Sequence, residues 1–174
     1  MKIYIVGPVG SGKTTFAKRM SDKTGIPYFE LDSVRFGAGS SECILNVKRE
    51  DDELNKIFNV IIDGENWIIE DVGRPCFEEG LKRANLIILL DMNTGLIMFR
   101  IFKRWLKQIL NIEKSNYKPN ILNLCKMYKW LFNYKYGKDG LKERLLQYKD
   151  KICVLYSKRS IEDYINNQRN VRRQ

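Results

Sequence analysis

The eight residues Gly7–Thr14 carry the clearest chemistry in this sequence. They read Gly-Pro-Val-Gly-Ser-Gly-Lys-Thr and satisfy the pattern G-x-x-x-x-G-K-[ST]. Glycines at these positions let the backbone curl so that consecutive N–H groups point at phosphate oxygens. Lys13 can then reach the β- and γ-phosphates, while the Thr14 hydroxyl is placed to ligate Mg²⁺. The segment predicts binding of a nucleoside triphosphate together with Mg²⁺.

The nucleotide is expected to contact the loop and the first residues of the helix that follows it. The expected contacts are Gly7, Val9, Gly10, Ser11, Gly12, Lys13, Thr14 and Thr15. The segment Ser157–Ser160, expected near the base, lacks the Asn-Lys-x-Asp signature of guanine-specific GTPases. ATP and Mg²⁺ are therefore the expected cofactors, with GTP as the alternative.

A carboxylate near the phosphates is needed for the metal ion, and it usually follows a neighbouring strand. Glu70 and Asp71 follow the apolar run Trp67–Ile69, and Asp91 follows Leu86–Leu90. Glu70 is preferred as the metal ligand, with Thr14. Asp91 lies just before an Asn-Thr pair, so helix capping is its more economical explanation.

The residue types that are missing exclude several other chemistries. The chain has no histidine, and its four cysteines are scattered without a Cys-x-x-Cys pair. A structural zinc site is not expected, and a nucleophile paired with histidine is excluded. Catalysis must therefore depend on Lys, Arg, Asp and Glu.

Short apolar segments alternate with helical patterns along the chain, and these elements must position the loop. Strands are predicted at Lys2–Val6, Tyr28–Leu31, Trp67–Ile69, Leu86–Leu90 and Ile152–Tyr156. Helices are predicted at 13–24, 49–62, 77–83, 94–111, 121–137, 141–148 and from 161 onward, and a mobile loop at 37–47. The alternation predicts an α/β fold with a parallel sheet covered on both faces.

Two of the predicted helices have apolar residues at helical spacing. In the helix at 94–111, a set spaced by four residues is expected on one buried side: Ile97, Ile101, Trp105 and Ile109. In the helix at 121–137 the corresponding set is Ile121, Leu124, Tyr128, Leu131 and Phe132. Both helices are therefore expected to pack through these sides.

Length and composition bound the organisation of the chain. The 174 residues are 44% hydrophobic and 30% charged, which fits one folded domain. The longest uninterrupted apolar run, Leu86–Leu90, is far shorter than the roughly 20 residues of a membrane span. The start of the chain resembles no secretory signal. A cytoplasmic protein with no membrane partner is expected.

The net charge of +10 is unevenly distributed. Residues 1–99 carry 12 Lys and Arg against 15 Asp and Glu, whereas residues 100–150 carry 13 against 4. Nine of the twenty aromatic residues also fall within 100–150: Phe102, Trp105, Tyr117, Tyr128, Trp130, Phe132, Tyr134, Tyr136 and Tyr148. Nucleic acid is therefore a possible partner. The alternative explanation is solvated lysines, with Trp105, Tyr128 and Phe132 buried because they lie at helical core spacing.

The order of these motifs resembles the adenylate-kinase-like branch of P-loop kinases, and in particular the small bacterial topology-modulation (FlaR-type) proteins. The segment Leu31–Arg35 is similar to the place where such kinases hold an Asp and an Arg near the phosphoryl acceptor. The segment Trp67–Arg74 is similar to their strand with an acidic residue and an acceptor-binding arginine, although Asp71 stands where glycine is usual. The resemblance implies Asp32, Arg35 and Arg74 as acceptor-binding residues.

Arg100 and Arg104 are similar to the R-x-x-x-R at the base of the lid in these enzymes. At i and i+4 on a helix, both guanidinium groups can converge on the transferring phosphate. The alternative is an exposed basic stripe. The resemblance also implies a three-layer P-loop fold with five parallel strands, the phosphate-loop strand at the centre, and a helical lid. The expected organisation is one domain, 1–174, with an acceptor-binding insert at about 33–66 and a lid at about 100–120.

Two functions are therefore expected. The first is a kinase that transfers the γ-phosphoryl group of ATP·Mg to a small acceptor, a nucleotide or nucleoside, with Lys13, Asp32, Arg100 and Arg104 as catalytic residues. Asp32 would accept the proton of a hydroxyl acceptor, would position a phosphate acceptor, or would merely cap a turn. The second is a nucleic-acid-associated ATPase or regulator that uses the basic C-terminal half. The sequence carries no signal for the acceptor or the oligomeric state.

Overall fold

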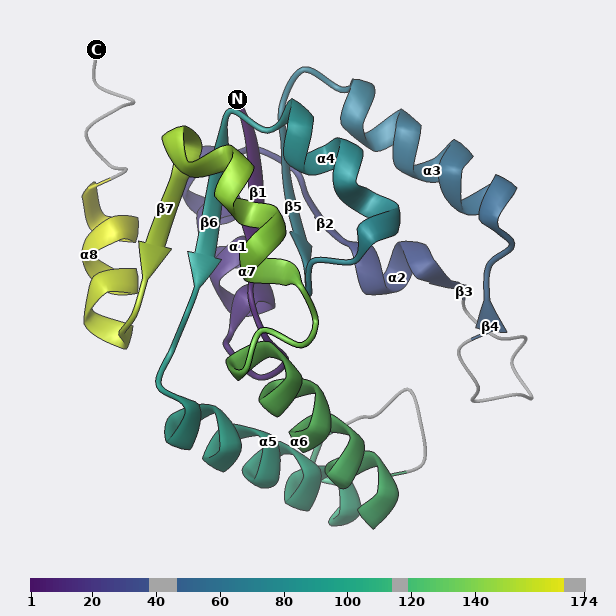
Figure 1. Ribbon diagram of the computed structural model, residues 1–174, viewed down its shortest axis with the longest axis vertical. Helices are drawn as coiled ribbons and strands as arrows, with labels where there is room; N and C mark the ends of the chain where they lie inside the picture. The colour runs from purple at the N-terminus through teal and green to yellow at the C-terminus, as the bar shows by residue number, and fades with distance from the viewer. Residues whose placement is uncertain (38–46, 114–118, 168–174) are drawn as a thin grey trace.

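A five-stranded parallel sheet forms the centre of the protein in the computed structural model, which describes residues 1–37, 47–113 and 119–167 (Figure 1). Its strands are β1 (Lys2–Val6), β2 (Tyr28–Glu30), β5 (Trp67–Asp71), β6 (Leu86–Leu90) and β7 (Ile152–Leu155). Their order across the sheet is β2-β5-β1-β6-β7, with every neighbouring pair parallel. The strand that leads into the phosphate loop is therefore central, as the family resemblance implied.

Helices connect these strands and cover the sheet. They are α1 (Lys13–Thr24), α2 (Leu31–Arg35), α3 (Asp51–Asp63), α4 (Glu78–Arg83), α5 (Thr94–Ile109), α6 (Ile121–Lys135), α7 (Leu141–Leu145) and α8 (Lys158–Asn167). Two 3₁₀ segments, η1 (Pro75–Phe77) and η2 (Leu146–Lys151), and a small antiparallel pair, β3 (Phe36–Gly37) with β4 (Val47–Lys48), complete the described part.

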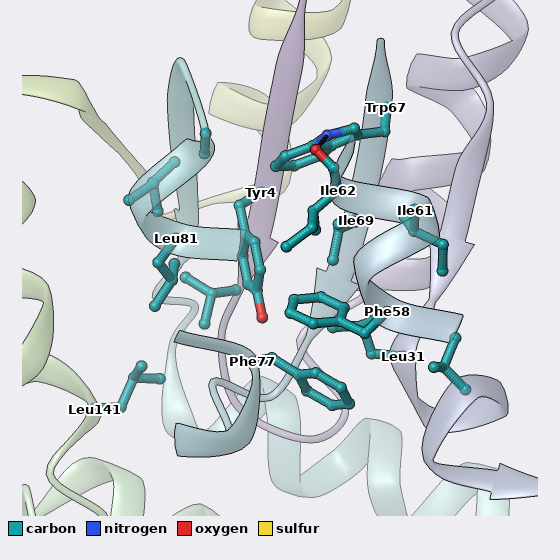
Figure 2. Close-up of a cluster of buried hydrophobic side chains, with 14 of the residues drawn as sticks. Tyr4, Leu31, Phe58, Ile61, Ile62, Trp67, Ile69, Phe77, Leu81 and Leu141 are labelled. Atoms are coloured by element: carbon teal, nitrogen blue, oxygen red, sulfur yellow. Dashed lines mark hydrogen bonds between the residues drawn. The ribbon is translucent and has the colours of Figure 1, made fainter. Parts of the chain in front are cut away.

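Alternate residues of each strand serve the two faces of the sheet, because successive side chains in a strand point in opposite directions. On one face, Ile3 and Ile5 pack with Phe16 and Met20 of α1 and with Ile165 of α8. The other face carries a larger cluster with α3, α4 and α7, drawn in Figure 2. The predicted α/β class with both sheet faces covered is confirmed.

The larger cluster is built around aromatic side chains. Tyr4 and Trp67 come from β1 and β5 and are fully buried, and Phe58 of α3 packs against Phe77 with ring centroids 4.8 Å apart (Figure 2). Gly80 of α4 lies directly against this cluster, because a Cβ at that position would stand 2.8 Å from the Tyr4 ring. This packing fixes β5, whose last residues enter the functional site.

Helices α5 and α6 form a hairpin beyond the carboxyl ends of the strands, at the bottom of Figure 1. Its small core contains Met92, Ile97 and Ile101 on one side and Leu124, Met127 and Leu131 on the other. Ile97 and Ile101 are buried as their spacing predicts, but Ile109 of the same set is 41% exposed. Of the aromatic residues expected to be buried, Trp105 and Tyr128 pack partly buried against this core, whereas Phe132 is 37% exposed and its predicted burial is wrong. Only one side of each helix is covered by its partner.

The predicted element boundaries hold with local differences. Strand β5 continues two residues past Ile69, so Glu70 and Asp71 belong to the strand and pair with Ile5 and Val6. Leu31 opens α2 instead of ending β2, and the terminal helix begins at Lys158. The mobile loop predicted at 37–47 falls mostly outside the described residues.

Within the described residues, no helix combines the length and the apolar character that crossing a membrane requires.

Candidate functional site

The phosphate loop joins the carboxyl end of β1 to the N-terminus of α1, the context that its motif requires. Gly12 is the N-cap of α1 with φ +99°, a left-handed conformation that residues with a Cβ rarely adopt. Gly7 has φ +152°, and a Cβ there would lie 2.7 Å from the Leu90 carbonyl oxygen. These two glycines therefore let the loop curl tightly against β6.

Lys13 is the first residue of α1, and its side chain folds back across the loop. It is 7% exposed, and its ammonium nitrogen donates a hydrogen bond to the Pro8 carbonyl oxygen at 3.0 Å. Burial lowers the pKa of Lys13, and the negative charges of Glu70 and Asp71 oppose that shift. The side chain thus places a cation under the loop, where phosphate oxygens would be held.

Thr14 and Glu70 meet beside this lysine. The Thr14 hydroxyl donates a hydrogen bond to Glu70 Oε1 at 3.0 Å, and Glu70 is 5% exposed. Burial raises the pKa of Glu70, while the Lys13 charge and the Thr14 hydrogen bond lower it. Two oxygen donors in contact fit Mg²⁺, which takes few protein ligands and completes its shell with phosphate oxygens and water. No cluster of three His, Cys, Asp or Glu suited to a metal occurs among the described residues.

Asp71, the neighbour of Glu70 in β5, has a different set of partners. Its side chain is fully buried and accepts hydrogen bonds from the backbone N–H groups of Gly73 and Arg74, both at 2.6 Å. The Arg74 guanidinium pairs with Asp71 through one nitrogen and with Asp32 through another. Asp71 therefore organises the turn after β5 and holds Arg74, so its oxygens are occupied without a metal.

Asp32 lies in the first turn of α2 and lines the same cleft as the phosphate loop. Its side chain is 63% exposed and contacts Arg74. The N-cap of α2 is Glu30, so Asp32 does not cap that helix. An exposed carboxylate oriented by an arginine can accept a hydrogen bond from a hydroxyl group.

Arg100 and Arg104 approach from α5. Arg100 donates a hydrogen bond to the Ser11 carbonyl oxygen at 3.1 Å, and Arg104 lies 3.6 Å from the Met127 sulfur. Gly10 brings the loop against the same helix, since a Cβ there would stand 2.9 Å from Ile101. Arg100 therefore does not belong to a free basic stripe but contacts the phosphate loop.

One cleft of about 350 Å³ unites most of the residues that the sequence indicated. Its lining includes Val9, Gly10, Gly12, Lys13, Thr14, Thr15, Asp32, Glu70, Arg100 and Arg104. Gly7 and Ser11 lie in the loop behind this lining, and Arg74 reaches the cleft through Asp32. Arg35 is directed elsewhere, to Asp51 at 3.1 Å. Among the expected acceptor residues, the structure thus brings together Asp32 and Arg74 but not Arg35.

The structure also places residues in the site that sequence reasoning missed. Glu113, beyond the end of α5, and Val72, beyond β5, line the cleft. The buried Ser11 hydroxyl has no hydrogen-bond partner among the described residues, which leaves it free for a ligand of the loop. No motif marks Glu113, because only the fold of the α5–α6 hairpin brings it to the cleft.

The prediction that Asp91 caps a helix is wrong. The N-cap of α5 is Asn93, whose side chain accepts the N–H groups of Gly95 and Leu96. Asp91 instead accepts a hydrogen bond from the Tyr134 hydroxyl at 2.8 Å and pairs with Lys142 at 2.9 Å. Its oxygens face α6 and α7, so the residue ties the hairpin to the sheet and does not line the cleft.

Comparison with known proteins is consistent with this geometry. The model of the ATPase family associated with various cellular activities (AAA) matches residues 3–72, the part that contains the phosphate loop, Asp32 and Glu70. Adenylate kinase from Thermotoga neapolitana is 38% identical over 65 residues, which cover 36% of this chain and 26% of that protein. The chain thus matches about a quarter of the length of this curated relative.

Solved structures match over nearly the whole chain. Shikimate kinase from Acinetobacter baumannii, in complex with shikimate, has a TM-score of 0.57 and 16% identity, covering 95% of this chain and 89% of that one. A sugar kinase from Janibacter sp. HTCC2649 has a TM-score of 0.52 and 18% identity, covering 96% and 91%. At these identities the likeness concerns the fold, so the chain has a P-loop kinase-like fold.

Proposed function

We propose that this protein is a kinase that transfers the γ-phosphoryl group of ATP·Mg to a hydroxyl group of a small acceptor, a nucleoside or another small alcohol. The observation that carries the proposal is the single cleft that joins the phosphate loop, Glu70 and Arg100 to Asp32. Such a cleft can hold donor and acceptor together, and phosphoryl transfer depends chiefly on that positioning and on charge stabilisation. Adenylate, shikimate and sugar kinases among the similar proteins support the same reaction class.

The donor half of the cleft supplies positive groups for the triphosphate. The N–H groups of the loop, the start of α1 and Lys13 bind the β- and γ-phosphates. Bound Mg²⁺ would neutralise charge on those phosphates, and Thr14 and Glu70 would hold it. Arg100, already at the loop, would stabilise the charge that develops on the transferring group.

A hydroxyl acceptor is favoured over a phosphate acceptor by the charges around Asp32. Both outer nitrogens of Arg74 are engaged by carboxylates, and Arg35 pairs with Asp51. Neither arginine is therefore free for the phosphate of a nucleotide, while the exposed Asp32 carboxylate would repel one. A neutral hydroxyl can instead donate its hydrogen bond to Asp32.

The proposed reaction is a single transfer of the γ-phosphoryl group from ATP to the acceptor hydroxyl. The acceptor oxygen forms a bond to the γ-phosphorus as the bond from that phosphorus to the β,γ-bridging oxygen breaks. The acceptor proton passes to Asp32 and from there to solvent, and ADP leaves with the electron pair of the broken bond. Arg74 holds the Asp32 carboxylate toward the acceptor throughout.

Membership of the topology-modulation branch is the finer part of this proposal. It is supported by the Leu31–Arg35 and Trp67–Arg74 segments, and by the placement of Asp32 and Arg74 in contact. Use of the basic C-terminal half by nucleic acid stays the second candidate function. Among the aromatic residues of 100–150 that the structure describes, four favour it because they are at least 37% exposed: Phe102, Trp130, Phe132 and Tyr136.

The test is ADP production from ATP·Mg with a panel of nucleosides, sugars, cyclic polyols and nucleoside monophosphates. We expect turnover with a hydroxyl acceptor, and a kcat about 10²–10⁴-fold lower in Asp32→Asn with little change in ATP affinity. Asp52→Asn, an exposed carboxylate of α3, is the matched control. Turnover with monophosphates alone would overturn the hydroxyl acceptor, and ATP binding without transfer to any member would overturn the kinase.

A further inference from the structure

Helix α5 has a second apolar side that nothing in the described structure covers. We call it the outer face of α5, and it consists of Leu96, Phe99, Phe102, Leu106, Ile109 and Leu110. These residues are between 38% and 62% exposed. Helical geometry of 3.6 residues per turn places all six within roughly 140° of arc, opposite the buried Ile97 and Ile101. The outer face is thus a continuous stripe and not a set of scattered residues.

Further exposed apolar residues follow α5 in the chain. Ile112, Ile121 and Leu122 are 69%, 58% and 66% exposed. The Trp105 indole N–H donates a hydrogen bond to the Asn120 carbonyl oxygen at 3.0 Å, which holds the start of α6 beside the second half of α5. At roughly 150–200 Å² per large apolar side chain, the six residues of the outer face expose on the order of 400–600 Å². Apolar patches of this size mark interaction surfaces.

The hairpin that carries this patch has almost no negative charge. Residues 92–138 contain ten Lys and Arg but one acidic residue, Glu113. On the helix, Lys103 falls inside the arc of the outer face near its edge, and Lys107 lies just beyond that edge, toward the side that carries Arg100 and Arg104. The surface therefore combines exposed aliphatic and aromatic side chains with flanking cations, the composition of helices that lie in the interface of a membrane.

We propose that the outer face of α5 binds the surface of an anionic lipid bilayer, with its apolar side chains among the acyl chains and Lys103 and Lys107 on the headgroups. No membrane partner was expected from the sequence because it has no apolar run of about 20 residues. A run of that length is needed only by a helix that crosses a bilayer. A helix lying in the interface needs an apolar stripe of this kind and no long apolar run. The inference does not depend on the proposed kinase activity.

Charge and residue type favour an anionic bilayer over a second copy of the chain and over single-stranded nucleic acid. A second copy of the chain would bring two hairpins of strongly positive charge together, and like charges at an interface oppose association. Single-stranded nucleic acid would be attracted by the cations and would stack on aromatic rings. It would leave the aliphatic majority of the outer face, Leu96, Leu106, Ile109 and Leu110, in water. An anionic bilayer satisfies both the cations and the aliphatic groups.

The test is sedimentation of the full chain with vesicles of phosphatidylcholine alone or with about 30 mol% phosphatidylserine. We expect binding to the anionic vesicles, little binding to the neutral ones, and weakening as salt rises from about 0.05 to 0.3 M. Phe99→Gln with Leu110→Gln should weaken binding to the anionic vesicles about tenfold or more. Lys103→Gln with Lys107→Gln should weaken it roughly thirtyfold.

Matched controls separate the outer face from general surface properties. Val60→Gln with Leu146→Gln removes two apolar side chains that are 76% and 71% exposed but lie on other elements. Lys56→Gln with Lys149→Gln removes the same number of charges elsewhere. Both control pairs should bind anionic vesicles as the wild type does. Thermal melts of all variants test whether each one keeps the wild-type fold.

The proposal is overturned if wild-type protein fails to bind anionic vesicles at low salt, a result that needs no variant. It is also overturned if the α5 variants bind as their controls do. A dimer in sedimentation velocity that Phe99→Gln with Leu110→Gln abolishes, without vesicle binding, would assign the face to a second copy. Salt-dependent binding of single-stranded DNA without vesicle binding would assign it to nucleic acid.

Discussion

Replacing Glu70 by glutamine should stabilise the protein and weaken its binding of ATP·Mg. Glu70 is buried, and its hydrogen bond from Thr14 can also be accepted by an amide oxygen. Burial raises the pKa of Glu70 above its ordinary value of 4.5, so the ionised side chain is less favourable in the folded chain than in the unfolded one. The glutamine side chain has no charge to bury.

The size and pH dependence of this gain follow from the same shift. Stabilisation by Glu70→Gln should be about 1 kcal/mol near neutral pH, in the range of substitutions that relieve an unfavourable functional residue. Because the pKa is raised on folding, the cost of the charge is fully present above the folded pKa and absent below the unfolded value of 4.5. The difference between the two proteins should therefore shrink as the pH falls toward 4.5.

The adjacent residue offers an internal comparison. Asp71→Asn should destabilise the protein by about 2–4 kcal/mol, because Asp71 accepts two backbone N–H groups and pairs with Arg74. Urea unfolding between about pH 4 and pH 8 measures both effects. Calorimetric titration with ATP·Mg should show affinity about 10–100-fold lower for Glu70→Gln, since the metal loses a carboxylate. Glu65→Gln, at an exposed position, is the neutral control.

Two results would refute this reasoning. If Glu70→Gln lowers stability at neutral pH, burial of the ionised Glu70 side chain does not cost stability, and the argument from its raised pKa is wrong. If the variant binds ATP·Mg with wild-type affinity, Glu70 is not part of the metal site, whatever its effect on stability.

Three further outcomes are expected. Gly7→Ala should lower the free energy of unfolding by about 2–4 kcal/mol in urea, because its Cβ would meet the Leu90 carbonyl oxygen; unchanged stability would contradict the described loop. Arg100→Ala should lower kcat about 10²–10³-fold in steady-state assays with a small effect on ATP affinity, because Arg100 contacts the phosphate loop. Lys103→Ala, on the same helix, should leave kcat unchanged. A loss of ATP affinity without a loss of kcat in Arg100→Ala would exclude transition-state stabilisation by Arg100. Tyr134→Phe should lower the free energy of unfolding by about 1–2 kcal/mol, measured by thermal unfolding, because Asp91 loses a hydrogen-bond donor. An unchanged Tm would show that other contacts hold the α5–α6 hairpin to the sheet.

Local patterns were sufficient for most of the sheet and for the donor half of the site. The phosphate loop could be predicted because its chemistry requires particular residue types at fixed spacing along one turn of chain. The strands could be predicted because each is a short apolar run between turn signals. Glu70 could be placed near Thr14 because parallel strands end at the same edge of a sheet.

The acceptor half depends on contacts between distant residues. The pairing of Asp32 with Arg74 joins positions 42 residues apart, and the diversion of Arg35 to Asp51 depends on how α3 packs beside α2. Neither spacing nor composition specifies such pairs. The unexpected role of Asp91 has the same origin, since Tyr134 and Lys142 reach it only after the hairpin has folded back.

The exposed side of α5 shows a further limit of sequence patterns. Periodicity indicated that α5 is amphipathic, but Ile97 and Ile109 differ in burial because α6 covers one side of the helix alone. A helix with two apolar sides gives a pattern that does not say which side is covered. Tertiary packing decides this, and in doing so it creates the surface proposed here for an anionic membrane.

The affinity of ATP·Mg for wild-type protein and for Lys13→Ala tests the central claim most directly. Lys18→Ala, an exposed lysine of the same helix, is the matched control. We expect wild-type and control proteins to bind ATP·Mg alike, and Lys13→Ala to lose about 100-fold or more in affinity, because the loop then lacks the ammonium group beneath the phosphates. Equal affinity in all three proteins would mean that the loop formed by Gly7–Thr14 does not bind the triphosphate.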